Sequence, residues 1–131
     1  MSAHTHRNHI IRAALESIAY QIRDVLDAMR SRAGIDPKVI HADGGATRNR
    51  FLMQFIADVT GLELTAAQVP DCSPLGAAMA GALGMGIYSN LDELARLPRQ
   101  AITYRPRMPA DQVEKLVAGW KRALGQVLHA G

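Results

Sequence analysis

Apolar side chains recur every three or four residues in two long stretches, one near each end of the chain. The first, about Asn8 to Ala33, has its apolar stripe at Ile11, Leu15, Ile18, Ile22, Val25 and Met29. The second, about Ala110 to His129, has it at Val113, Leu116, Val117, Trp120, Leu124 and Val127. This spacing predicts two amphipathic helices. Further apolar residues widen the first stripe beyond a coiled-coil seam, which favours packing on a sheet.

The segment from Val39 to Gly61 predicts a strand, a glycine turn and a helix. Val39-Ile40 is β-branched and apolar, as in a buried strand. Gly44-Gly45 allows positive φ or a close approach of a ligand to the backbone. Thr47 and Asn49 are candidate caps for the helix that follows, whose apolar positions have helical spacing.

The remaining segments complete an α/β pattern. Leu62 to Ala66 alternates as a short strand, and Ser73-Pro74 suggests an N-cap followed by proline at the first helical position, with the helix ending near Gly84. Asn90 with Glu93 predicts a capping box and a short helix to Leu97. Residues 101–104 are a candidate extended piece. The whole chain, 1–131, is predicted to be a single domain whose first eight residues are flexible.

Composition excludes several classes of function. The net charge is +3, but the twelve arginines are scattered and aromatic residues make up only 5%, so neither a basic stripe nor a stacking surface for nucleic acid is predicted. No apolar run reaches the length of a membrane span. A single cysteine, Cys72, and the absence of a signal-like segment favour a reducing, cytoplasmic location.

The strand–turn–helix segment holds the candidate chemistry. A helix N-terminus after glycines presents free N–H groups to an anion or polar ligand, although many such turns bind nothing. Asp43 is the only carboxylate placed to face a ligand there, and a structural acceptor role is equally compatible with its position. No nucleophile has a nearby base, so no catalytic residue is predicted. Histidines 4, 6 and 9 have no carboxylate or cysteine close by to complete a metal site.

The same segment resembles the adenosine motif of the sugar-kinase and actin ATPase superfamily. More narrowly, the chain is similar to the C-terminal part of the FGGY carbohydrate kinases, and within them to the glycerol kinases. The matching segments occur in the family's order from about His9 to Leu94: residues 9–13, 15–21, 23–26, 43–45, 49, 51–54, 57–58, 75–78 and 90–94.

The resemblance implies a partial ribonuclease-H-like, actin-like ATPase domain, and an ATP-dependent kinase that transfers the γ-phosphoryl group to a sugar or polyol hydroxyl. It implies ATP and Mg²⁺ as cofactors in the complete enzyme. It also implies that Gly45 and Asn49 contact adenosine and that Gly44 shapes the turn. Where the family commonly has small residues, this chain has Thr47-Arg48, which leaves the role of Arg48 open between flanking the nucleotide and facing solvent.

The resemblance has consequences for activity and assembly, and two other functions are alternatives to it. The phosphate-gripping hairpin, the catalytic base and the sugar site of the family are not in this sequence, so the chain alone is expected to be inactive. An uncovered sheet edge favours a homo-oligomer. The first alternative is a non-catalytic remnant that only self-associates or binds a partner. The second, a nicotinamide-binding module, is disfavoured because Gly81, Gly84 and Gly86 do not form its glycine fingerprint.

Overall fold

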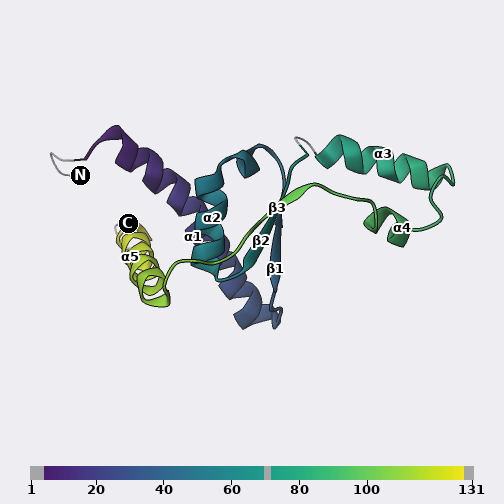
Figure 1. The fold of residues 1–131 in the computed structure, drawn as a ribbon. Coiled ribbons are helices and arrows are strands. Elements are labelled where there is room, and N and C mark those ends of the chain that lie inside the picture. Colours follow the sequence, from purple (N-terminus) through teal and green to yellow (C-terminus); the bar gives the residue numbers. More distant parts are fainter. Residues whose placement is uncertain (1–4, 70–71, 129–131) are drawn as a thin grey trace.

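The computed structural model describes residues 5–69 and 72–128 as a three-stranded sheet with helices (Figure 1). The elements in chain order are α1 (Arg7–Ala33), β1 (Val39–Ala42), the 3₁₀ helix η1 (Gly45–Arg48), α2 (Arg50–Thr60), β2 (Glu63–Ala67), α3 (Cys72–Gly84), α4 (Leu91–Ala95), β3 (Ala101–Tyr104) and α5 (Ala110–Leu128). The α/β prediction is therefore confirmed. α1 begins at Arg7, so the last two residues of the segment expected to be flexible, Arg7 and Asn8, are helical. Residues 1–4 of that segment lie outside the described residues.

The sheet has the strand order β1-β2-β3. β1 and β2 are parallel, with His41 opposite Thr65, and α2 supplies the crossover that a parallel pair requires. β3 runs antiparallel to β2 and brings Tyr104 opposite Leu64. Within the described residues β1 pairs on one side only, so its other edge is open.

Side chains alternate between the two faces of the sheet, and the helices cover one of them. Leu64 and Ala66 of β2 are fully buried in the core together with the apolar face of α2. Val39, His41 and Thr103 lie exposed at alternate positions. The sheet is thus packed on one face and largely open on the other.

An aromatic cluster joins α1, α2 and α5 across the core. Tyr20 meets Phe55 edge-on at 5.6 Å between ring centroids and stacks on Trp120 at 5.4 Å. Trp120 Nε1 donates a hydrogen bond to Asp24 Oδ2 at 2.8 Å, which fastens α5 to α1. Burial, and secondarily the charge of Glu16, raises the pKa of the Tyr20 hydroxyl.

The first helix packs chiefly against α2, whereas its apolar stripe predicted packing on a sheet. Its buried residues are Ala19, Tyr20 and Leu26. Ile18 and Val25, both in the predicted stripe, are 43% and 60% exposed. The physical reason is the width of the packing partner. A single helix, α2, covers a narrower part of the apolar stripe than a sheet would, so one side of the stripe stays exposed.

Helix boundaries follow local chemistry, with small departures from prediction. Gly61 ends α2 in the left-handed conformation at φ 69°, as predicted. The Asn90 side chain accepts a hydrogen bond from Glu93 N at 3.0 Å and begins α4, which ends at Ala95 instead of Leu97. β2 spans Glu63–Ala67, one residue later than expected.

The predicted cap of α3 is wrong. This helix already includes Cys72, so Ser73 and Pro74 lie inside its first turn. Proline remains tolerated there because the first N–H groups of a helix have no partner within the helix. The residue that precedes Cys72 lies outside the described residues.

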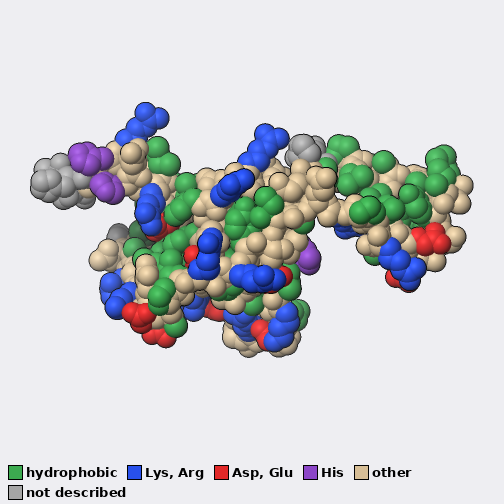
Figure 2. Space-filling model, in the orientation of Figure 1, with side chains coloured by type: hydrophobic (Ala, Val, Ile, Leu, Met, Phe, Trp, Pro, Cys, Tyr) green, Lys and Arg blue, Asp and Glu red, His purple; other side chains and the backbone are tan. Residues whose placement is uncertain are grey.

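The arm formed by α3 and α4 extends away from the α1–α2–α5 side (Figure 1). No residue of α3 is buried, and Figure 2 shows hydrophobic side chains gathered on the surface of this arm. Within the described residues no helix is both long and apolar enough to cross a membrane.

Candidate functional site

The turn between β1 and α2 has the conformation that its glycines predict. Gly44 adopts φ 84° and ψ −176°, a region that a residue with a side chain rarely enters. η1 follows at once over Gly45–Arg48, and the Asn49 backbone N–H donates to the carbonyl of Ala46 at 3.0 Å. Gly44 is therefore required by the backbone path of the turn.

Gly45 contributes open space. It is exposed, its φ is not positive, and a Cβ built on it would meet no atom of the described residues within 4 Å. Glycine at this position is therefore not explained by packing within the chain. What it provides is an unobstructed backbone surface beside the start of α2, which a ligand can approach closely.

Asn49 begins α2, as predicted. Its side-chain Oδ1 accepts a hydrogen bond from Leu52 N at 3.1 Å, the usual N-cap contact. The residue is half-buried, and its amide nitrogen has no hydrogen bond to another described residue. Asn49 therefore presents two N–H donors at the turn, while its oxygen is already engaged.

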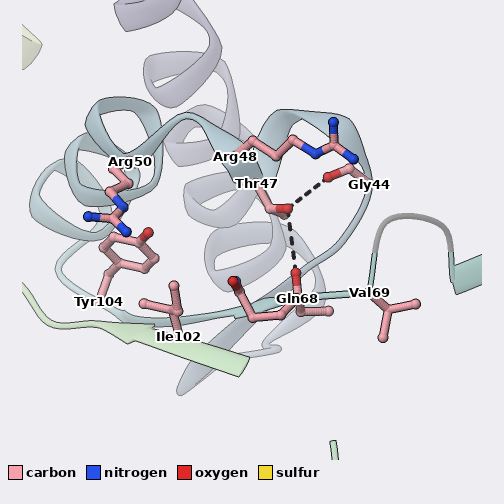
Figure 3. A pocket seen from close by; sticks show the side chains of 9 residues that line it. Gly44, Thr47, Arg48, Arg50, Gln68, Val69, Ile102 and Tyr104 are labelled. Atoms are coloured by element: carbon pink, nitrogen blue, oxygen red, sulfur yellow. Dashed lines mark hydrogen bonds between the residues drawn. The ribbon is translucent and has the colours of Figure 1, made fainter. Parts of the chain in front are cut away.

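Thr47 does not cap α2, in contrast to the sequence-based expectation. Its side chain points inward from η1 and is only 7% exposed. Its hydroxyl donates to the Gly44 carbonyl at 2.8 Å and lies 3.5 Å from the carbonyl of Ala67 (Figure 3). The short 3₁₀ helix, which precedes α2, turns this residue toward β2. Thr47 thus ties the glycine turn to the end of the second strand.

A pocket of about 280 Å³ lies beside this turn (Figure 3). Its lining residues are Gly44, Thr47, Arg48, Arg50, Ala67, Gln68, Val69, Ile102 and Tyr104. Of the predicted site residues only Gly44 lines it, whereas Gly45 and Asn49 lie outside it on the same turn. Arg48 is exposed and lines the pocket.

A second cavity of about 560 Å³ receives Asp43. Leu75 and Gly76 line the same cavity, so the first turns of α3 reach it. His41 and Cys72 also line it, and Cys72 is half-buried. The structure therefore places Asp43 and Arg48 in different cavities beside one turn.

The described residues include no cluster of metal-ligating side chains. Residues 5–69 and 72–128 contain no group of three His, Cys, Asp or Glu side chains that could hold a metal ion. Around the turn the described residues offer hydrogen-bond donors, positive charge and the single carboxylate of Asp43.

Arg50, Gln68 and Tyr104 also line the pocket, although the sequence pattern predicts none of them as a site residue. Tyr104 comes from β3, more than fifty residues after the turn, and reaches the pocket only because β3 pairs with β2. No spacing in the sequence signals this contact. Arg50 directly follows the predicted cap, so its position at the start of α2 is the one signal that was available.

Comparison with known proteins identifies the family. The model of the C-terminal domain of the FGGY family of carbohydrate kinases matches residues 1–85. The glycerol kinase of Petrotoga mobilis is 47% identical over 116 residues, which cover 88% of this chain and 23% of that protein. The glycerol kinase of Shewanella woodyi is 42% identical over 125 residues, covering 95% and 25%.

Solved structures agree with this result. A crystal structure of Plasmodium falciparum glycerol kinase with ADP matches with a TM-score of 0.82 and 31% identity over 96% of this chain and 25% of that one. The xylulose kinase from Rhodospirillum rubrum matches with a TM-score of 0.76 and 29% identity over 99% and 26%. The predicted actin-like ATPase fold is thereby confirmed.

In each case the match covers about a quarter of the relative's length. The share of this chain that is matched is nevertheless large, from 88% to 99%. The chain therefore belongs to the FGGY family of carbohydrate kinases, as part of the C-terminal domain that its residues 1–85 match.

Proposed function

We propose that this chain is the adenosine-side portion of an ATP-dependent, glycerol-kinase-like enzyme. The complete enzyme would transfer the γ-phosphoryl group of ATP to a hydroxyl of a sugar or polyol, with glycerol as the first candidate. Support comes from glycerol kinases among the relatives and from a structural neighbour that was solved with ADP. A cytoplasmic location belongs to the same proposal.

The observation that carries the proposal is the geometry of the turn. Gly45 leaves backbone surface open, and Asn49 offers an amide whose nitrogen has no partner among the described residues. Both lie next to the N-terminus of α2, where backbone N–H groups favour a polar ligand. Gly45 and Asn49 would contact the adenosine part of ATP, and Gly44 would hold the turn in shape.

Phosphoryl transfer in such enzymes depends mainly on positioning and on neutralising charge around Mg²⁺-ATP. In this proposal the chain contributes no base to that step, and its described residues include no group of three His, Cys, Asp or Glu side chains that could hold a metal ion. In this proposal Mg²⁺ is held by the nucleotide phosphates and by parts of the longer enzyme. The chain itself binds and orients adenosine.

The direct test is an assay of the isolated chain with γ-labelled ATP, Mg²⁺ and a panel of polyols and pentoses. We expect no labelled product, because the chain supplies only adenosine contacts. A complete glycerol kinase assayed in parallel shows that the panel and conditions support turnover. Phosphorylation by the isolated chain would contradict its role as an adenosine-side portion.

The second candidate is a non-catalytic module that self-associates or binds a partner protein. The open edge of β1 and the exposed face of the sheet favour it. The two candidates differ in nucleotide binding. If the chain self-associates but adenosine does not shift the NMR signals of Gly45 and Asn49, only the non-catalytic module is supported.

A further inference from the structure

We propose that the pocket between η1, β2 and β3 is a binding site for a phosphate monoester, separate from the adenosine contacts of Gly45 and Asn49. The site is built by Arg48, Arg50 and Tyr104 around the 280 Å³ space beside the glycine turn. This proposal does not rest on the proposed nucleotide role, since the three residues need no adenosine to bind a phosphoryl group.

Tyr104 is the first evidence for a ligand. Its side chain is largely enclosed, with 9% of the residue exposed, yet its hydroxyl forms no hydrogen bond with any other described residue. Figure 3 shows the ring beside Arg50 with the hydroxyl directed toward the space between Arg50 and Thr47. Among the described residues no buried side-chain oxygen lacks a hydrogen-bond partner, so the Tyr104 hydroxyl oxygen is open to the pocket. A ligand oxygen in the pocket can therefore accept a hydrogen bond from it without displacing a protein partner.

The charge of the lining is the second evidence. Arg48 and Arg50 both line the pocket, and neither forms an ion pair with a described carboxylate. No acidic residue of the ranges 5–69 and 72–128 lines this space. Guanidinium groups are charged at every physiological pH, so the pocket holds two permanent positive charges that no described carboxylate on its wall neutralises.

The shape of the pocket favours a phosphoryl group carried on a small molecule. Arg50 reaches it from the start of α2, and Arg48 runs along the turn toward Gly44 (Figure 3). A tetrahedral phosphate, with close to two negative charges, can accept hydrogen bonds from donors on different sides at once. Ile102 and Val69 form an apolar part of the wall, which a free phosphate ion would not contact favourably. The remaining volume suits the organic part of a monoester.

The test is a titration of the ¹⁵N-labelled chain, followed by NMR, with inorganic phosphate and separately with ribose 5-phosphate at constant ionic strength. We expect saturable shifts at Arg50, Gln68 and Tyr104 with both probes. Tighter binding of ribose 5-phosphate assigns the site to monoesters. Equal binding would overturn that assignment and leave a site for the phosphate ion alone.

Variants separate the site from general attraction of anions. Arg48→Gln and Arg50→Gln should each weaken binding about tenfold, as for loss of a hydrogen bond to a charged group. Tyr104→Phe keeps the buried ring and should weaken binding roughly threefold to tenfold. Arg122→Gln, at an exposed arginine of α5 without an ion pair to a described carboxylate, is the matched control and should have no effect. Shifts that do not saturate, or that Arg50→Gln and Arg122→Gln change equally, would overturn the site.

An adenosine titration distinguishes this proposal from the nucleotide role. Adenosine carries no phosphate, so it should perturb Gly45 and Asn49 in the Tyr104→Phe and Arg50→Gln variants as it does in the unchanged chain. Loss of phosphate binding with adenosine binding intact would show that the two sites are independent. Adenosine binding that fails in the unchanged chain would count only against the proposed function.

Discussion

Asn49 Oδ1 accepts a hydrogen bond from the backbone N–H of Leu52 at 3.1 Å, so the residue expected to contact adenosine also begins α2. One side chain therefore has two roles that use different atoms. The oxygen stabilises the helix, and the amide nitrogen is left for a ligand. Substitutions at this position can separate the two.

Replacing Asn49 tests that separation. Asn49→Ala removes the cap and should lower the free energy of unfolding by about 1 kcal/mol. Asn49→Ser keeps a capping oxygen and should leave stability nearly unchanged. Both variants lack the amide and should lose the adenosine-induced shift at Gly45. Urea denaturation and NMR titration measure the two effects, and normal adenosine binding by Asn49→Ser would contradict the role of the amide.

Local chemistry made much of the fold predictable from the sequence. The asparagine caps of α2 and α4, the terminal glycine of α2 and the two long helices all depend on nearby residues. Their signals therefore lie within a few positions. The ion pair between Arg12 and Glu16, at 2.6 Å, is likewise a consequence of helical spacing.

Tertiary contacts were less predictable. Thr47 satisfied the sequence pattern of a cap, but its hydroxyl bonds to the carbonyl of Gly44 because η1 turns it inward. The stripe of α1 was visible, whereas which part of it would be buried depended on the width of α2. Tyr104 reaches the candidate site only through the pairing of β3 with β2. Such contacts require the arrangement of distant segments and leave no local pattern.

Asp36 predicts a small dependence of stability on pH. Hydrogen bonds from Lys38, and then from Arg30 at 3.0 Å, hold the pKa of the Asp36 carboxyl below its ordinary value. A lowered pKa in the folded state gives stability that is present above the unfolded pKa, about 3.9, and is lost as pH falls through the folded value. The carboxyl is exposed, so the effect is expected to be modest.

The measurement for Asp36 is a carboxyl-detected NMR titration. Lys38→Gln should shift the Asp36 pKa upward, toward the ordinary value. Asp36→Asn should make the midpoint of urea denaturation less sensitive to acid. Lys115→Gln, which removes an exposed pair with Asp111 on α5, serves as the control and should leave the Asp36 titration unchanged. An Asp36 pKa at or above the ordinary value would contradict the assignment.

The open sheet predicts self-association. β1 has a free edge among the described residues, and its Val39 is 41% exposed on the uncovered face. Exposed strand edges and apolar surface both favour pairing with another chain. Sedimentation equilibrium should show a dimer or larger species.

Substitution locates the surface responsible. Val39→Lys should shift the assembly toward monomer, because a charged residue on an edge strand disfavours pairing. Val127→Lys, at an exposed apolar residue of α5, should leave the assembly unchanged. A chain that is monomeric at high concentration, or an assembly indifferent to Val39→Lys, would contradict pairing through the sheet.

The central claim is that this chain contacts adenosine through the glycine turn, and an NMR titration of the amides of Gly45 and Asn49 tests it most directly. Titrations with adenosine, AMP, ADP and ATP are run in excess inorganic phosphate, which occupies the proposed phosphate pocket. We expect weak binding, around millimolar or ~4 kcal/mol, and similar for all four ligands because the residues described here grip adenosine and not the triphosphate. Gly45→Val should abolish binding without unfolding the chain, since a Cβ at this position meets no described atom within 4 Å and the φ of Gly45 is not positive, whereas Gly119→Val on α5 should leave binding unchanged. A strong preference for ATP over AMP, or binding undisturbed by Gly45→Val, would contradict the claim.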